Sequence, residues 1–251
     1  MRAGLMPVAA VTGASRGLGR AIAEALAAQG YAVACLGRDV DALNETAQRV
    51  RAAGAAVSLH TADVGDPSFA APFVTETVAE HGGLDLVVNC AGILGEKTAA
   101  EMTPEEYLRV LNVNLVAAFA LSSAAYPHLR DAPGASVVNI GSFYGSIGVP
   151  GFAAYASSKA GMEGLTRTLA VEWARDDIRV VCVAPGYVAT EMLQGALSDE
   201  RVAERLVSRI PLKRVASAEE IAGIVCFLAS PAAAFITGAT IVADGGQVIK
   251  I

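Results

Sequence analysis

The sequence predicts one α/β domain built on a doubly wound, seven-stranded parallel sheet with helices on both faces. Three observations support this fold class. Short apolar runs alternate with helical segments along the chain, which is the pattern of repeated strand, helix and strand units. A glycine-rich turn joins the first strand to the first helix. The 251 residues contain no internal repeat, linker or low-complexity segment, so we expect a single domain over residues 1–251.

Composition limits the class of protein. Hydrophobic residues make up 53% of the chain and the formal net charge is −6. These values predict a large core with at least one subunit interface, and they argue against nucleic-acid and anionic-membrane partners. The two long uncharged windows, 110–129 and 221–243, contain polar residues or turn signals, so neither is expected to span a membrane. We expect a cytoplasmic protein.

The metal-binding residue types show no functional spacing. The four cysteines lie far apart in apolar segments without a C-x-x-C pair, and the three histidines lack ligand-like spacing. Both patterns are typical of core or surface residues. We therefore expect neither a disulfide nor a metal site.

The chain opens with a strand over residues 8–11, a glycine turn and an alanine-rich helix that extends to Gln29. Glycines in such a turn let the backbone approach a pyrophosphate, and the helix N-terminus offers unpaired N–H groups. The spacing is Gly-x-x-x-Gly-x-Gly rather than Gly-x-Gly-x-x-Gly, so the rest of the chain must support the assignment. We expect cofactor contacts from Gly13, Ser15, Arg16, Gly17, Leu18 and Gly19.

The same turn also fits a second motif. Residues 13–17 read Gly-Ala-Ser-Arg-Gly, the Gly-x-Ser-x-Gly nucleophile elbow of serine hydrolases. Such an enzyme needs its catalytic histidine late in the chain, whereas the last histidine here is His128. The sequence therefore favours a dinucleotide site.

The second strand begins at Gly30 and ends in Gly37 and Arg38. An NAD-specific site has a carboxylate at this point for the ribose 2′-hydroxyl. Arg38 and Arg16 can instead flank a 2′-phosphate, because guanidinium groups match phosphate geometry, unless both are simply solvated. We therefore predict NADP(H) as the cofactor.

A helix over residues 41–53 and a strand over 55–61 come next. The strand is followed by Asp63 and Val64. At this point of an open α/β sheet an adenine could be contacted, so both residues are predicted cofactor contacts.

A helix over residues 67–81 leads to the fourth strand, 84–88. The strand is followed by Asn89, Ala91 and Gly92. Small residues at the carboxyl end of a strand leave room for a ligand in the crevice of an open sheet, so we expect these three to contact the cofactor.

Thr103 begins the next helix as its N-cap, and Glu106 completes a capping box. This helix carries Asn114 in an otherwise apolar run. A buried asparagine needs hydrogen-bond partners. Asn114 therefore either braces the helix against a neighbouring backbone or serves the site.

Tyr155 and Lys159 are four residues apart in a predicted helix that extends to about Arg175, so their side chains share one face. The ammonium group favours the phenolate and lowers the cost of proton release by Tyr155. Ser142, which follows the strand 136–140, could share a substrate oxygen with Tyr155. The Tyr-x-x-x-Lys spacing alone is a weak signal, because a surface lysine beside a half-buried tyrosine has the same pattern.

The remaining elements are a strand over 178–183, a helix over 219–229 and a strand over 240–243. Between them, residues 191–214 are amphipathic and irregular. Their apolar side chains can form a lid over a substrate, at about 187–214, or can pack in a core or interface. The candidates are Met192, Leu193 and Leu197.

Together these features resemble the short-chain dehydrogenase/reductase family along the whole chain, in the short form that includes 3-oxoacyl-[acyl-carrier-protein] reductases. The resemblance depends on five motifs in order. They are Thr12-Gly13-x-x-x-Gly17-x-Gly19, Asn89-x-Ala91-Gly92, Asn114, the set Ser142, Tyr155 and Lys159, and Pro185-Gly186.

The resemblance implies a Rossmann-like fold and a role for each residue. Tyr155 would be the general acid in reduction, Ser142 would hydrogen-bond the carbonyl oxygen, and Lys159 would bind the nicotinamide ribose. Asn114 would hold a water that links Lys159 to solvent. A positioned donor pair suits the alkoxide that develops during hydride transfer. Further cofactor contacts are implied for Tyr155, Pro185, Gly186, Val188 and Thr190.

Three positions depart from the family pattern. Cys90 stands where a second asparagine is common, and the strand before Pro185 lacks a frequent asparagine. Carrier-protein reductases present a basic residue after the catalytic helix, whereas here Arg175 is followed by Asp176 and Asp177. This acidic pair opposes the docking of an acidic carrier protein.

We therefore expect an NADPH-dependent reductase that converts a ketone, such as a 3-oxoacyl thioester, to a secondary alcohol. A dehydrogenase of a free alcohol, sugar, steroid or polyketide is the alternative within the same class, and a non-catalytic nucleotide sensor is the alternative outside it. The complete catalytic set favours an enzyme. The family also implies a homotetramer, built through the helices around Asn114 and Tyr155 and through the C-terminal strand.

Overall fold

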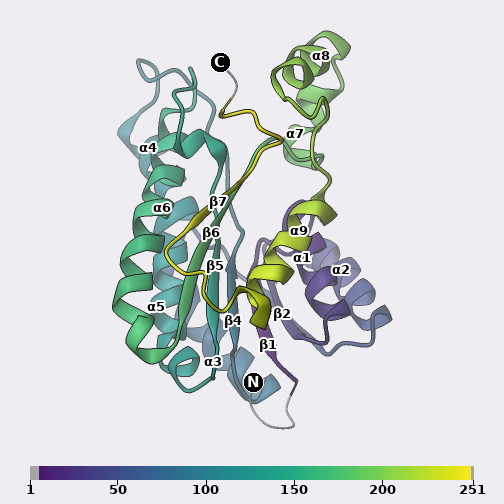
Figure 1. Cartoon of the computed structure of the whole chain (residues 1–251), viewed down its shortest axis with the longest axis vertical. Coiled ribbons are helices and arrows are strands. Elements are labelled where there is room, and N and C mark those ends of the chain that lie inside the picture. The colour runs from purple at the N-terminus through teal and green to yellow at the C-terminus, as the bar shows by residue number, and fades with distance from the viewer. Residues whose placement is uncertain (1–5, 250–251) are drawn as a thin grey trace.

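The computed structural model describes residues 6–249, and for Ala196 and Leu197 only the backbone. Seven parallel strands form one sheet in the order β3-β2-β1-β4-β5-β6-β7, with helices on both faces (Figure 1). This confirms the predicted fold class. The strands are β1 Val8–Thr12, β2 Ala32–Gly37, β3 Val57–Thr61, β4 Leu86–Asn89, β5 Ser136–Ile140, β6 Arg179–Pro185 and β7 Thr240–Ala243.

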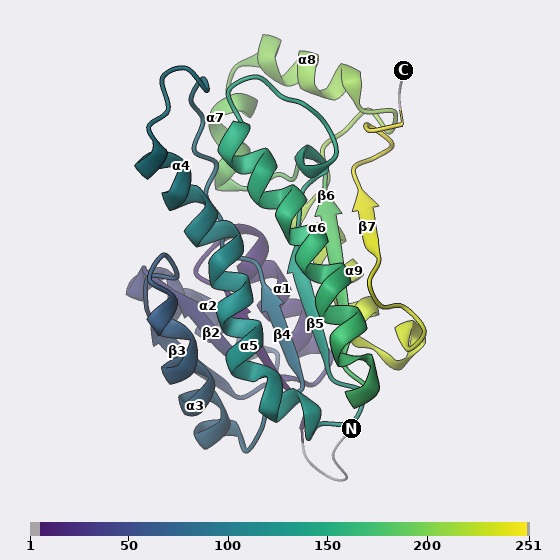
Figure 2. The same ribbon diagram turned by 90° about the vertical axis from the view of Figure 1, so that its left-hand side faces the viewer.

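The helices form one layer on each face of the sheet (Figure 1; turned by 90° in Figure 2). One layer contains α1 Gly17–Ala28, α2 Val40–Ala52 and α9 Ala218–Ala229, and the other contains α3 Ala70–His81, α4 Pro104–Leu111, α5 Ala117–Arg130 and α6 Ala153–Trp173. The helices α7 Glu191–Leu197 and α8 Glu200–Arg209 lie beyond the carboxyl ends of the strands.

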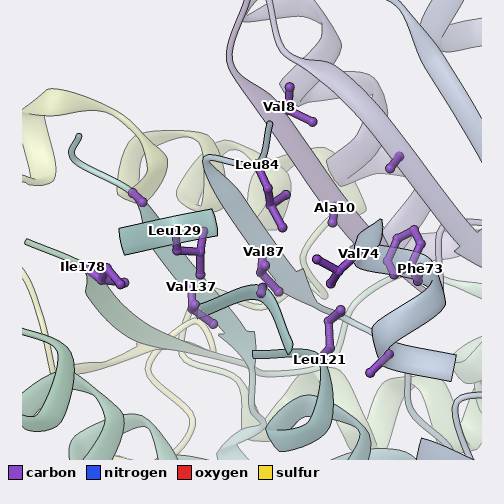
Figure 3. Close-up of a cluster of buried hydrophobic side chains, with 14 of the residues drawn as sticks. Val8, Ala10, Phe73, Val74, Leu84, Val87, Leu121, Leu129, Val137 and Ile178 are labelled. Atoms are coloured by element: carbon purple, nitrogen blue, oxygen red, sulfur yellow. The ribbon is translucent and has the colours of Figure 1, made fainter. Parts of the chain in front are cut away.

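Alternation along the strands divides the core into two clusters. In β1, Val8 and Ala10 pack with α3, α5 and α6, whereas Ala9 and Val11 pack with α1, α2 and α9. Figure 3 shows the first cluster, where Leu121 and other helix residues meet the apolar side chains of β1, β4 and β5. Because helices cover both faces, the central strands are apolar on both sides, as in parallel sheets generally.

The strand order reverses between β1 and β4, which lie side by side although β1 is followed in sequence by β2. The crevice beyond the carboxyl ends of strands at such a reversal is where open α/β sheets bind ligands. The glycine turn after β1 and the residues after β4 therefore meet at this crevice.

Two elements differ from the sequence-based expectation. The helix that begins at Thr103 is interrupted by a π-helical turn over Asn112–Val116, between α4 and α5. The segment 191–214, expected to be irregular, contains α7 and α8, and the Asp199 side chain caps α8 by accepting from Arg201 N and Val202 N. Local capping thus orders a segment whose hydrophobic pattern alone predicted no element.

The run Pro104–Arg130 is long and apolar enough to cross a membrane by length and composition. Its α5 part, however, buries Leu121 and Leu129 in the core cluster of Figure 3. Only 39% of its most apolar window is buried, and Phe119 is 52% exposed. The run is therefore a core helix with a second, uncovered apolar face.

Candidate functional site

The glycine turn is shaped by close backbone contacts. Gly13 and Gly17 have φ angles of +69° and +52°, in the left-handed region that favours glycine. A Cβ on Gly13 would lie 2.9 Å from the Cα of Ala91, and one on Gly19 would collide with the carbonyl of Gly13. Each glycine of the motif is therefore required by this backbone, which brings the turn close to Ala91 after β4.

The end of β1 is joined to the end of β4 by one side chain. Thr12 Oγ1 accepts hydrogen bonds from the backbone N–H groups of Cys90, at 3.0 Å, and Ala91, at 3.1 Å. Sequence reasoning placed Thr12 in a motif without a role. The structure shows that Thr12 aligns the two edges of the crevice.

The N-terminus of α1 makes no side-chain capping bond with its N-cap residue, Arg16, whose backbone is extended. First-turn N–H groups without such a cap, together with the positive end of the helix dipole, suit an anion. Leu18 is half-buried against the α1, α2 and α9 cluster. Ser15 is buried beside Gly37, where a Cβ would lie 3.1 Å from its side chain.

The two arginines predicted to hold a 2′-phosphate differ in their surroundings. Arg16 donates from Nη2 to Asp39 Oδ2 at 2.7 Å, and both side chains are exposed. Asp39 also accepts from Ala42 N and so caps α2. Arg38 is exposed. Sequence reasoning missed Asp39, although its position just before a predicted helix is typical of an N-cap.

The predicted adenine contacts have intramolecular roles in the structure. Asp63 Oδ1 accepts from Gly65 N at 2.9 Å, which shapes the turn after β3. The side chain of Val64 is buried in the core cluster of Figure 3. A contact from Val64 to a ligand is therefore expected to come from its backbone.

Asn89 belongs to a buried polar chain beneath the crevice. Its Nδ2 donates to Ser122 Oγ at 3.0 Å and to Asn139 Oδ1 at 2.8 Å, and Asn139 Nδ2 donates to Thr166 Oγ1 at 2.9 Å. These bonds connect β4, β5, α5 and α6. The amide nitrogen of Asn89 is thus bonded within the protein, and we expect the predicted cofactor contact of Asn89 to come from its main chain.

Asn114, in the π-helical turn, is buried with 1% of its surface exposed. Its Oδ1 accepts from Ile93 N at 2.8 Å, and its Nδ2 donates to Ile93 O at 2.9 Å and to Ser158 Oγ at 3.0 Å. Ser158 Oγ in turn donates to Tyr155 O at 2.7 Å. These contacts fit the bracing alternative, because they link the loop after β4 to the helix that carries Tyr155 and Lys159.

Lys159 is buried, with 4% exposed, and is held beside Tyr155. Its Nζ donates to Ile140 O at 2.7 Å and lies 5.6 Å from the centroid of the Tyr155 ring. A Cβ on Gly92 would lie 3.7 Å from this Nζ and 3.3 Å from Asn114 Oδ1. The residues of three separate motifs therefore converge at one place.

Ser142 lies at the end of β5, 6% exposed, and its Oγ accepts from Tyr144 N at 3.2 Å. This bond caps a short 3-10 turn, Phe143–Gly145. The serine hydroxyl proton is not engaged by that bond, so Oγ can still donate to a substrate oxygen.

Sequence reasoning missed an aromatic cluster around Tyr155. The Tyr144 ring meets Tyr155 edge to face at 5.9 Å and Phe152 at 5.2 Å, and the Tyr144 and Tyr187 hydroxyl oxygens lie 3.2 Å apart. Burial and the hydrogen bond with Tyr187 raise the pKa of Tyr144. Aromatic residues are 6% of the chain, yet four fall within residues 143–155, which is the signal that could have revealed the cluster.

The segment after β6 is anchored to two other parts of the chain. Pro185 is the last residue of β6, and a Cβ on Gly186 would lie 2.7 Å from the Cα of Asp244. Val188 pairs with Ala216 in a parallel bridge, which brings the two ends of the segment 188–216 together.

The start of α7 lies against α1. A Cβ on Gly17 would be 3.4 Å from Thr190 Cβ and 3.1 Å from Glu191 Oε2. Of the predicted lid residues, Met192 is 54% exposed and Leu193 is half-buried, while the side chain of Leu197 lies outside the described residues.

Comparison with known proteins agrees with this arrangement. Residues 13–247 match the family model described as enoyl-(acyl carrier protein) reductase. The acetoacetyl-CoA reductase of Shinella zoogloeoides is 39% identical over 240 residues, which cover 96% of this chain and 98% of that protein. The 3-oxoacyl-[acyl-carrier-protein] reductase FabG of Staphylococcus aureus is 38% identical over 240 residues, which cover 95% and 97%.

Solved structures show the same fold. A protein described as a short-chain alcohol dehydrogenase from Sinorhizobium meliloti has a TM-score of 0.94 and 38% identity, over 98% of this chain and 97% of that one. A protein described as a 2-deoxy-D-gluconate 3-dehydrogenase from Agrobacterium tumefaciens, with bound NADP, has a TM-score of 0.91 and 34% identity, over 98% of each chain. Such similarity along nearly the whole chain defines an oxidoreductase class built on the Rossmann-like fold. The protein belongs to the short-chain dehydrogenase/reductase family and is similar to 3-oxoacyl-[acyl-carrier-protein] reductases.

Proposed function

We propose that this protein is an NADPH-dependent carbonyl reductase that converts a ketone to a secondary alcohol, with Tyr155 as the general acid. The observation that carries the proposal is the position of Lys159. Its buried ammonium group is fixed by Ile140 O at 2.7 Å and lies 5.6 Å from the Tyr155 ring. A buried cation is costly unless it is well bonded or functional.

The start of α1 fits the cofactor, because Arg16 provides no side-chain cap for its first-turn N–H groups, which can therefore bind a pyrophosphate. When bound, the reduced nicotinamide supplies the hydride. The pyrophosphate would be held by the glycine turn, and the nicotinamide end by Lys159, Val188 and Thr190. Backbone groups of Val64, Asn89, Ala91 and Gly186 would complete the site.

The protein's own part in the reaction is to bind the carbonyl oxygen and to deliver a proton. Ser142 and Tyr155 donate hydrogen bonds to this oxygen and stabilise the alkoxide that develops there. Tyr155 then transfers its proton to the oxygen, and the Lys159 ammonium stabilises the resulting phenolate. Asn114 keeps Lys159 and Tyr155 in register through Ser158.

Preference for NADP(H) is supported by Arg38, which is exposed beside the crevice, and by the NADP bound to the Agrobacterium relative. Arg16 would need to exchange its bond with Asp39 for one with the 2′-phosphate. Arginine suits such an exchange, because its planar fork binds carboxylate and phosphate alike.

The substrate is a small-molecule or acyl-thioester carbonyl compound, as the names of the relatives suggest. The segment 187–214 would act as a lid over it, since this segment starts at the crevice and α8 buries no side chain among its described residues. Asp176 accepts from Tyr126 and pairs with Arg175, and its side chain is 20% exposed. The exposed charged groups at the end of α6 are therefore Arg175 and Asp177, which have opposite signs. This mixed surface offers an acidic carrier protein no uniformly basic docking site at that point.

The uncovered apolar faces support a homotetramer. We further expect a cytoplasmic protein with neither nucleic acid nor membrane as a partner, in keeping with the net charge of −6. Apolar side chains are exposed in two parts of the chain. One set lies on the helices α4, α5 and α6 and consists of Leu108, Phe119 and Val171. The other consists of Val242, on the edge strand β7, and Phe235, which precedes that strand. Two such faces on one chain fit two different contacts between identical subunits.

The test is the variant Tyr155→Phe, which removes only the proton donor. Turnover of NADPH with a ketone panel should fall by about 10²- to 10⁴-fold, the usual contribution of a general acid, while NADPH binding stays within a few-fold. Tyr126→Phe is the matched control, because Tyr126 donates to Asp176 instead. Unchanged turnover in Tyr155→Phe would refute the general acid, and absence of turnover in the wild type would favour a nucleotide sensor. The same assay with NADH tests the cofactor preference.

A further inference from the structure

We propose that Tyr144 and Tyr187 form a specificity-determining pair that restricts the substrate to compact ketones, such as small cyclic ones, and disfavours long-chain acyl thioesters. The inference rests on the proposed function, because it assigns the substrate side of the same site. Tyr144 lies in the 3-10 turn after β5, and Tyr187 lies in the segment after β6. The pair therefore joins the loop that follows Ser142 to the base of the proposed lid.

The rings around Tyr155 form a wall. The Tyr144 ring lies 5.9 Å from the Tyr155 ring at an interplanar angle of 85°, and 5.2 Å from Phe152 at 74°. It also meets the buried Phe143 at 4.7 Å. A carbonyl group hydrogen-bonded to Tyr155 therefore has an aromatic surface directly beside it.

Several contacts hold this wall in place. The Tyr144 and Tyr187 hydroxyl oxygens are 3.2 Å apart, and the Tyr187 ring meets Phe143 at 5.2 Å and 76°. Tyr187 O also accepts from Ala216 N at 2.9 Å, which fixes its backbone at the base of the proposed lid. Edge-to-face contacts of this kind favour one arrangement of the rings.

The Tyr144 hydroxyl group stays protonated at ordinary pH. Burial raises the pKa of Tyr144, and the contact with Tyr187 raises it further. Tyr144 therefore keeps its proton, and one hydrogen bond joins the two hydroxyl groups. The Tyr144 ring is held by Phe152 on its own loop and by the Tyr187 hydroxyl group at the base of the proposed lid. The wall therefore resists displacement by a long, flexible acyl chain, whereas a small ring can pack against it.

The size of the expected effect follows from known pockets. One methylene group too many or too few in a packed apolar pocket changes kcat/KM by about 10- to 200-fold. Truncation of Tyr144 removes a whole ring from the wall. The ratio of kcat/KM for a long-chain 3-oxoacyl thioester to that for cyclohexanone should therefore rise by at least about 10-fold in Tyr144→Ala.

Conservative variants separate the hydroxyl contact from the ring. Tyr144→Phe and Tyr187→Phe each keep the ring and remove the same hydrogen bond. Each should raise the ratio by about two- to fivefold, the value of one neutral hydrogen bond, and the double variant should raise it no further. A merely structural role would lower the melting temperature without moving the ratio. Tyr31→Phe is the matched control, because its hydroxyl bonds Ala229 O and is far from the site in sequence and in the sheet.

The outcomes are distinct. A higher ratio in Tyr144→Ala and equal, non-additive shifts in the two phenylalanine variants support the pair. A wild type that prefers the long-chain thioester, or an unchanged ratio in all variants, overturns the pair but leaves the reductase function intact. A wild type that reduces neither probe overturns the proposed function and this inference together.

Discussion

The floor of the crevice and the segment above it are built in opposite ways. On the floor, Asn114, Ser158 and Lys159 are all at least 96% buried, and each has hydrogen-bond partners. Above it, Met192 is 54% exposed, and α8 buries no side chain among its described residues. Figure 1 shows α7 and α8 beyond the carboxyl ends of the strands, and Lys159 bonds Ile140 O at the carboxyl end of β5, so the two regions lie at the same end of the sheet.

This difference separates two tasks. A proton donor must be held in one geometry, so its supporting groups are buried and bonded. A cover for the substrate must open and close, so it comes from segments with little buried surface. The two regions can be disturbed separately by substitution, and the largest loss of activity is expected from a change on the floor.

Removal of the cation from the floor should have the largest effect. In Lys159→Met, the ammonium beside Tyr155 is replaced by an apolar chain of similar length, so the phenolate loses its stabilising charge. Ketone turnover should fall by about 10²- to 10⁴-fold, as for loss of an acid–base group. Lys97→Met is the control, because Lys97 pairs with Glu106 at the surface. Turnover within a few-fold of the wild type would contradict the role of Lys159.

The hydrogen bonds of Asn114, which link the loop after β4 to α6, should contribute to stability as well as to activity. Asn114→Ala leaves the N–H and C=O groups of Ile93 without their side-chain partner. Buried polar groups left unpaired cost about 1–3 kcal/mol each, or about 2–6 kcal/mol for two. Because Ile93 is only half-buried, the free energy of unfolding should fall by an amount in the lower part of this range, about 2–4 kcal/mol. Denaturant titration measures this. Asn112→Ala, at an exposed position two residues away, should change it by less than about 0.5 kcal/mol. Equal effects of the two variants would rule out the brace.

A smaller effect is expected where the proposed lid meets the glycine turn. Glu191 places a carboxylate oxygen 3.1 Å from the position of a Cβ on Gly17, at the start of α1. This charge opposes a phosphate at the same helix N-terminus. Glu191→Gln should therefore tighten NADPH binding by about two- to fivefold at low salt, the usual size of a charge effect at a helix end. Fluorescence titration measures the affinity, and Glu200→Gln on α8 should leave it unchanged.

The smallest effect is expected at the end of the proposed lid. Arg214 bonds Glu220 through both oxygens, at 2.6 and 2.7 Å, and lowers the pKa of that carboxyl to about 2, with a further contribution from Ser217 N–H. A carboxyl whose pKa is depressed on folding adds stability above its ordinary value of 4.5, and this stability is lost as the pH falls toward 2.

Both side chains of this pair are exposed, so solvent screens the contribution. The melting temperature of Glu220→Gln should be slightly below that of the wild type at neutral pH, and the two should converge in acid. A difference that persists at low pH would assign the effect to the capping of α9 instead.

Much of the fold could be predicted because its signals are local. The alternation of apolar runs predicts the strands, and the glycines of the first turn are required by positive φ angles and close contacts within the turn. The capping box of Thr103 and Glu106 is present as predicted. Tyr155 and Lys159 share a helix face because they are four residues apart in α6.

Other features could not be predicted, because they depend on how distant segments meet. The bonds of Asn89 to Ser122 and Asn139 follow from strand register and helix position. The same holds for Asn114, which lies in a π-helical turn. No periodic pattern in the sequence indicates such a turn. Arg16 meets Asp39 only because β1 and β2 end side by side.

By itself, the sequence determined the elements, their order and the chemical groups available for reaction, because backbone propensity and hydrophobic period act within a few residues. Only the tertiary structure decided which groups are bonded to one another and which remain free for a ligand. The contact between Tyr144 and Tyr187 illustrates the difference, since 43 residues separate the two phenols in the chain. Such contacts are set by the packing of the whole sheet, which no local pattern contains.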